Sequence, residues 1–202
     1  MIEIIKLILG EFIKEFSPST TTSYNERYIH HYFSHRLQNK FPIVLNSTNI
    51  CMLHPEWATA KKGTNRCAFY YKSGSKYLPS DKGGSGFIDF AIGNLESPIV
   101  GIEFKMSKSF NKDGAIFDYT KLLDNRNRLD LAISIDIYYG RSKEIKVESL
   151  NENLQNATNI LKDSKKLSNR QHCFWVIEYY KDKVNIFKSS GNELKFIKIS
   201  EI

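Results

Sequence analysis

The chain of 202 residues is long enough for one domain with a substantial hydrophobic core. Hydrophobic residues make up 41% and charged residues 25% of it, which is typical of a globular protein, and no apolar run approaches the length of a membrane span. Five charges within residues 1–16 do not fit a secretory signal peptide, and three scattered cysteines argue against a disulfide framework or zinc cluster. We therefore expect a cytoplasmic protein with no membrane partner.

The first half of the chain predicts two helices followed by strands. Apolar residues recur at helical spacing in both predicted helices, and a Ser-Pro-Ser-Thr break separates them. A β-prone stretch and a basic segment, residues 58–82, come next. The predicted helices cover residues 1–16 and 23–40, and the predicted strands cover residues 67–72, 87–92 and 99–106.

The second half predicts two more helices and several strands. The helices cover about residues 113–128 and 147–161, and the strands cover residues 129–139, 173–180, 184–188 and 194–199. This order predicts a single α/β domain with a central mixed β-sheet flanked by helices. We divide residues 1–202 into an N-terminal helix (1–22), a core (23–139) and a C-terminal helix and strands that complete or extend the sheet (140–202).

Three charged residues stand within two otherwise apolar predicted strands: Asp89, Glu103 and Lys105. Side chains alternate between the two faces of a strand, so Glu103 and Lys105 share one face, while Val100, Ile102, Phe104 and Met106 form an apolar opposite face. Two carboxylates and a lysine on a rigid hairpin have the chemistry to bind a divalent metal and to position a water. The tripeptide Glu-x-Lys occurs three times in the chain, but only residues 103–105 lie in a cleanly alternating strand.

Asp89, followed fourteen residues later by Glu103-x-Lys105, resembles the PD-(D/E)XK nuclease superfamily. The resemblance covers about residues 23–139 and implies that this region is the catalytic core of a restriction-endonuclease-like fold. It implies Mg²⁺ as cofactor, with Mn²⁺ able to substitute, held by Asp89, Glu103 and the backbone carbonyl of Phe104. Lys105 is then expected to orient the attacking water or to stabilise the transition state.

Glu26 lies at the centre of the apolar stripe of the second predicted helix, where a carboxylate must be neutralised, paired or bound to a cation. The superfamily resemblance implies a first-helix Glu that reaches the metal through water, and Glu26 matches this position. The alternative is a first-turn acid that stabilises the helix dipole.

Further polar residues form a second group of candidates. The resemblance implies polar residues near the site on the helix after Lys105, where Asp118 and Lys121 lie; the alternative is a capping or surface role. Glu56 is either an additional metal ligand or a turn residue. His31 and His35 lack the intervening Glu of a metalloprotease motif, so we interpret them as ordinary helix residues.

The basic segment carries six Lys and Arg residues against one acid between positions 58 and 88, a net charge of +5, and aromatic residues are interleaved. Such a composition suits a polyanion, because cations neutralise phosphates and rings stack on bases; the alternative is a solvated basic loop. The expected nucleic-acid contacts are Lys61, Lys62, Arg66, Lys72, Lys76, Lys82, Lys108 and Lys112.

Together these features predict a Mg²⁺-dependent endonuclease acting on DNA, in restriction, phage defence, repair, resolution or transposition. Cutting both strands of a duplex generally needs two active sites, so a homodimer is one expectation. The alternatives are a non-catalytic nucleic-acid-binding module with the same fold, and a sugar- or lipid-processing enzyme with an acid pair. The lysine beside Glu103 and the basic segment favour the nuclease.

Overall fold

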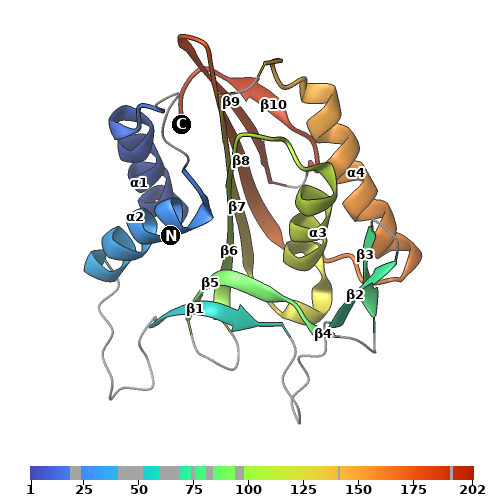
Figure 1. Cartoon of the computed structure of the whole chain (residues 1–202). Helices are drawn as coiled ribbons and strands as arrows, with labels where there is room; N and C mark the ends of the chain where they lie inside the picture. The colour runs from blue at the N-terminus through green and yellow to red at the C-terminus, as the bar shows by residue number, and fades with distance from the viewer. Residues whose placement is uncertain are drawn as a thin grey trace.

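The structure is a computed structural model, shown in Figure 1, that describes residues 1–18, 24–40, 52–59, 69–73, 76–80, 84–93, 98–140, 142–191 and 193–202. Only the backbone is described at residues 40, 52, 69–73, 76–80 and 84–85. The start of the β-prone stretch before position 52 and much of the basic segment lie outside the described residues. No helix within the described ranges combines the length and apolar character needed to cross a bilayer.

Seven strands form one mixed sheet in the order β1-β5-β6-β7-β8-β9-β10. The β6–β7 and β7–β8 pairs are parallel, and the other four neighbouring pairs are antiparallel. The strands are β1 (Met52–Ala58), β5 (Phe87–Gly93), β6 (Pro98–Ser107), β7 (Leu131–Tyr139), β8 (Gln171–Tyr180), β9 (Lys183–Ser190) and β10 (Ile197–Ile199). The C-terminal third of the chain therefore extends the sheet that contains the predicted hairpin.

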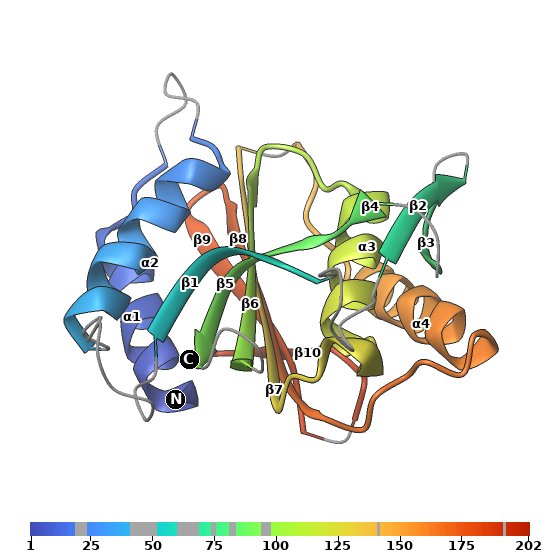
Figure 2. The same ribbon diagram turned by 90° about the horizontal axis from the view of Figure 1, so that it is seen from below.

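Helices cover both faces of the sheet, as Figures 1 and 2 show, which confirms the predicted α/β class with a flanked mixed sheet. One face packs against α1 (Ile2–Glu15) and α2 (Glu26–Lys40). The other packs against α3 (Lys112–Leu123) and α4 (Val147–Asp163), which make the two parallel crossovers. Two crossovers that advance in the same direction place their helices on the same face, because both have the same hand.

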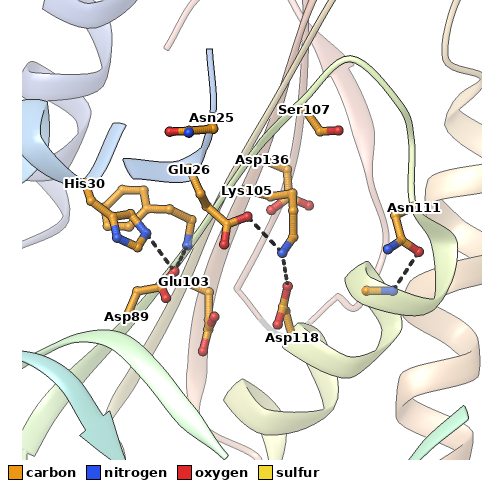
Figure 3. Close-up of polar contacts among 12 residues, drawn as sticks. Asn25, Glu26, His30, Asp89, Glu103, Lys105, Ser107, Asn111, Asp118 and Asp136 are labelled. Carbon is orange, nitrogen blue, oxygen red and sulfur yellow. Dashed lines mark hydrogen bonds and ion pairs between the residues drawn. The ribbon is translucent and has the colours of Figure 1, made fainter. Parts of the chain in front are cut away.

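Strand β6 separates two hydrophobic cores, and its alternation follows the prediction. Val100, Ile102, Phe104 and Met106 are buried in the core beneath α1 and α2. Glu103 and Lys105 point to the opposite face, where α3 lies (Figure 3). The apolar face anchors the strand, and this fixes the direction of the two charged side chains.

Two details differ from the sequence prediction. The helix expected to reach residue 128 ends at Leu123, because the Asp124 side chain accepts a hydrogen bond from the Arg126 amide and starts a 3₁₀ turn, Asn125–Asn127. A separate three-stranded sheet, in the order β3-β2-β4, lies beside α3 and α4 in Figure 1. Its strands are β2 (Phe69–Ser73), β3 (Lys76–Ser80) and β4 (Gly84–Ser85), so the strand expected at 67–72 belongs to this smaller sheet.

Candidate active site

Asp89 is held at the point where β5 leaves β6. The two strands pair from Gly93 to Phe90, and the next positions along them are Asp89 and Glu103. There the Phe104 amide donates to Asp89 Oδ2 at 2.7 Å, so a side-chain oxygen takes the place of a strand carbonyl. A charge-assisted hydrogen bond of this kind fixes the carboxylate beside Glu103.

His30 of α2 lies against the same carboxylate. Its Nε2 atom is 3.2 Å from Asp89 Oδ2, and its ring packs against those of Phe90 and Phe104 at centroid distances of 5.5 and 5.4 Å. Burial lowers the pKa of His30, but the hydrogen bond and negative charge of Asp89 outweigh it, so the net pKa is raised above its ordinary value. Figure 3 shows the imidazole pointing from the helix to Asp89.

Five side chains of alternating charge, which we call the charge chain, run from β6 through α3 to α2. Lys121 Nζ lies 2.6 Å from Glu103 Oε1 and 3.2 Å from Asp118 Oδ1. The other Asp118 oxygen is 3.3 Å from Lys105 Nζ, which in turn is 3.1 Å from Glu26 Oε2. Figure 3 shows Lys105 between Glu26 and Asp118. The charge chain therefore holds both lysines in place.

Electrostatics within the charge chain keep both lysines protonated. Burial lowers the pKa of Lys105 and of Lys121, but the carboxylates beside them outweigh it, and both values are raised above the ordinary range. Burial raises the pKa of Glu103 well above normal; Lys121 opposes this rise, whereas the charges of Asp118 and Asp89 add to it.

A further carboxyl group belongs to Asp136 of β7, the strand next to β6. It pairs with Lys105 in the parallel ladder and is 2% exposed. Tyr119 donates to its Oδ2 atom at 3.0 Å and Ser134 donates to its Oδ1 atom at 2.8 Å. Burial raises the pKa of Asp136 to about 7, against the opposing effect of these hydrogen bonds and of Lys105.

The structure brings together six residues singled out in the sequence: Glu26, Asp89, Glu103, Lys105, Asp118 and Lys121. Two placements differ from the expectation. The Glu26 side chain, at the first residue of α2, is 40% exposed rather than buried, and it pairs with Lys105. Asp118 and Lys121 are 7% and 5% exposed, so the alternative of surface residues is wrong.

Glu56 lies on the neighbouring strand, next to the site. Its neighbours Pro55 and Trp57 pair with Phe90 and Ile88, so Glu56 stands across the ladder from Asp89. It is exposed, it has a positive φ of 52°, and its charge contributes to the raised pKa of His30. The expected roles of Glu56 and of the Phe104 carbonyl as metal ligands remain predictions.

Few of the expected nucleic-acid contacts can be placed. Lys108 and Lys112 are exposed, at the end of β6 and the start of α3. Lys72 and Lys76 lie on β2 and β3, where only the backbone is described. Lys61, Lys62, Arg66 and Lys82 lie outside the described residues.

Sequence reasoning missed His30 and Asp136. The signal for His30 is its i, i+4 spacing from Glu26, which places both residues on one helix face. The histidines considered in the sequence analysis, His31 and His35, are exposed. The signal for Asp136 was a single acid in an apolar strand, the pattern that identified Asp89 and Glu103.

Comparison of the chain with protein-family models, with curated proteins and with solved structures gives no match.

The fit of a divalent metal rests on the donor set. Across the described part of the chain, no three Asp, Glu, His or Cys side chains are grouped closely enough to hold a metal ion. Asp89 and Glu103 nevertheless offer hard oxygen donors from adjacent strands, which suit Mg²⁺. Burial is the main cause of the raised pKa of Glu103, and a cation beside its carboxylate opposes that rise, as Lys121 already does. The donor chemistry fits Mg²⁺ at Asp89 and Glu103.

Proposed function

We propose that the protein is a Mg²⁺-dependent endonuclease with a restriction-endonuclease-like core, which hydrolyses phosphodiester bonds of DNA. The observation that carries the proposal is the position of Lys105, two residues from Glu103 on one strand face and fixed between Glu26 and Asp118. Asp89 lies on the adjacent strand, at the position next to Glu103. This is the residue set that phosphodiester hydrolysis needs: two acidic ligands and a fixed cation.

Each residue has a distinct task in this proposal. Asp89 and Glu103 hold Mg²⁺, which lowers the pKa of a bound water and stabilises charge on the scissile phosphate. The raised pKa of Lys105 keeps its ammonium group charged, so it acts as a cation and hydrogen-bond donor toward the phosphate or the attacking water, not as a general base. Glu26 and Asp118 restrict where that ammonium group can lie.

One observation favours a second candidate, a nucleic-acid-binding module without catalytic activity. Both proposed metal ligands already have nitrogen partners in this structure: His30 Nε2 beside Asp89 and Lys121 Nζ beside Glu103. A site neutralised in this way could serve stability alone. The two candidates differ in whether the protein cleaves nucleic acid or only binds it.

The test compares cleavage with binding. Wild type, Glu103→Gln and Lys105→Met are incubated with plasmid DNA, single-stranded DNA and RNA, with Mg²⁺, Mn²⁺ or EDTA. Lys162→Met, an exposed lysine in the last turn of α4, is the matched control. The proposal expects metal-dependent DNA cleavage by wild type and by the control, lost in both site variants while DNA binding persists.

Other results separate the alternatives. Cleavage that survives both site substitutions contradicts the proposal, and binding without cleavage by wild type supports the non-catalytic module. Cleavage of RNA alone would change the substrate class. A role in restriction or phage defence, and a homodimeric state, remain predictions for the active protein.

A further inference from the structure

The ammonium group of Lys121 occupies a shell of three oxygen atoms. Glu103 Oε1 lies 2.6 Å from Nζ, the Phe87 carbonyl oxygen 2.7 Å and Asp118 Oδ1 3.2 Å. The three oxygens come from β6, β5 and α3, so three elements of the fold converge on one side chain. The Phe87 carbonyl accepts a hydrogen bond from Nζ, and the carboxylates of Glu103 and Asp118 form ion pairs with it.

This lysine is buried and ion-paired within the fold. Its residue is only 5% exposed, and burying an unpaired ammonium group would be strongly unfavourable. The carboxylates of Glu103 and Asp118 provide the pairing that this burial requires. The Phe117 ring lies 4.9 Å from Nζ and adds a cation–π contact.

The shell has the composition of a hard-cation site. Two carboxylate oxygens and a backbone carbonyl are the donors that Mg²⁺ and Mn²⁺ take in proteins. In two-metal phosphodiesterases, a second ion lies about 4 Å from the first and shares a carboxylate with it. Here the carboxylate available for sharing is Glu103, and one of its oxygens is already held by Lys121.

We infer that Lys121 is a resident cation that fills the second cation position of this site, so that the protein takes one divalent ion, at Asp89 and Glu103. The inference rests on the proposed function for the first ion. It also predicts that removing the ammonium group uncovers a latent metal site made of Glu103, Asp118 and the Phe87 carbonyl.

The test measures metal stoichiometry without any substrate. Mn²⁺ bound per chain is determined by equilibrium dialysis and by electron paramagnetic resonance for three proteins: wild type, Lys121→Ser and Lys121→Met. Serine leaves room for an ion, whereas methionine removes the charge but keeps most of the volume. We expect one Mn²⁺ per chain for wild type, two for Lys121→Ser and one for Lys121→Met.

The outcomes separate this inference from the proposed function. Two ions in wild type, or one ion in both wild type and Lys121→Ser, overturn the inference and leave the nuclease proposal standing. No ion in either protein contradicts both. No ion in wild type but one in Lys121→Ser supports the resident cation and contradicts the proposed metal-dependent function.

Thermal unfolding covers the case in which Lys121→Ser is too unstable for dialysis. Because the uncovered site exists only in the folded state, Mn²⁺ should raise the Tm of Lys121→Ser more than that of Lys121→Met or wild type. An equal rise in all three proteins, or no rise in Lys121→Ser, overturns the inference.

Discussion

Lys105 on β6 and Asp136 on β7 are direct partners in the parallel ladder, with the Asp136 carboxyl group buried beneath the charge chain. The charge of Asp136 contributes to the raised pKa of Lys105, and Lys105 in turn opposes the rise in the pKa of Asp136. A buried acid thus lies under the lysine that we propose to act on the phosphate.

The raised pKa of Asp136 predicts a specific dependence of stability on pH. Its pKa is about 7 in the folded protein and about 3.9 when unfolded, so between these values the folded state binds more protons. The contribution of this group to stability is therefore fully present below about pH 4 and is lost as pH rises to about 7. Urea unfolding should show Asp136→Asn gaining stability relative to wild type over this range, by at most about 1.4 kcal/mol per pH unit. A difference that does not change with pH would contradict the assignment.

The pairing of His30 with Asp89 predicts a shift that NMR can measure. Asp89→Asn removes the charge that opposes the effect of burial, so the pKa of His30 should fall. His172 is a reference within the same sample: burial lowers its pKa to about 4, and its ring hydrogen-bonds to Ser189 instead. If the titration of His30 is the same in both proteins, the pair does not exist in solution.

The two acids that hold Lys105 should differ in their effect on stability. Asp118 contacts both lysines and is almost fully buried, so Asp118→Asn leaves buried cations undercompensated and should destabilise the fold by about 3–5 kcal/mol. The Glu26 side chain is 40% exposed, so Glu26→Gln should change stability by less than about 1 kcal/mol. Chemical denaturation of both variants tests this order, and equal losses would refute it.

Much of the scaffold follows from patterns visible in the sequence. The alternation of β6 predicted which face is apolar. The two other Glu-x-Lys tripeptides, at 144–146 and 193–195, lie in loops, although the strand expected at 194–199 includes Leu194 and Lys195; the observed strand begins at Ile197. Periodicity works for these elements because each has one buried face. Helix ends were less predictable: a single Asp124 side chain ends α3 earlier than its hydrophobic pattern implied.

The site was predictable as a set of residue types, but its pairings were not. Lys121 was placed in the second group of candidates, because the local sequence does not show that a lysine on α3 contacts Glu103 on the sheet. The helical wheel placed Glu26 in the core, whereas its side chain is 40% exposed and pairs with Lys105. Contacts between distant segments depend on the packing of whole elements, which one sequence does not state.

The packing of α2 on the sheet positions both Glu26 and His30, and it can be tested through Phe33. Its ring lies 4.8 Å from that of Phe104 on β6 and 6.5 Å from that of Phe12 on α1. Phe33→Ala should destabilise the protein by about 3–5 kcal/mol, because it leaves a cavity at this junction. Leu7→Ala is the control, since Leu7 is 53% exposed on α1 and its truncation should have little effect. A loss as small as that of Leu7→Ala would show that α2 does not pack on β6 as described.

The central claim is that Asp89 and Glu103 hold a divalent ion beside Lys105. The most direct measurement is anomalous scattering from a crystal of the protein soaked in Mn²⁺. We predict one peak between the Asp89 and Glu103 carboxylates, at metal–oxygen distances of about 2.1 Å, with Lys121 still bound to Glu103. The account would be contradicted by a soaked crystal with no peak at this position, in which His30 and Lys121 remain the partners of the two acids.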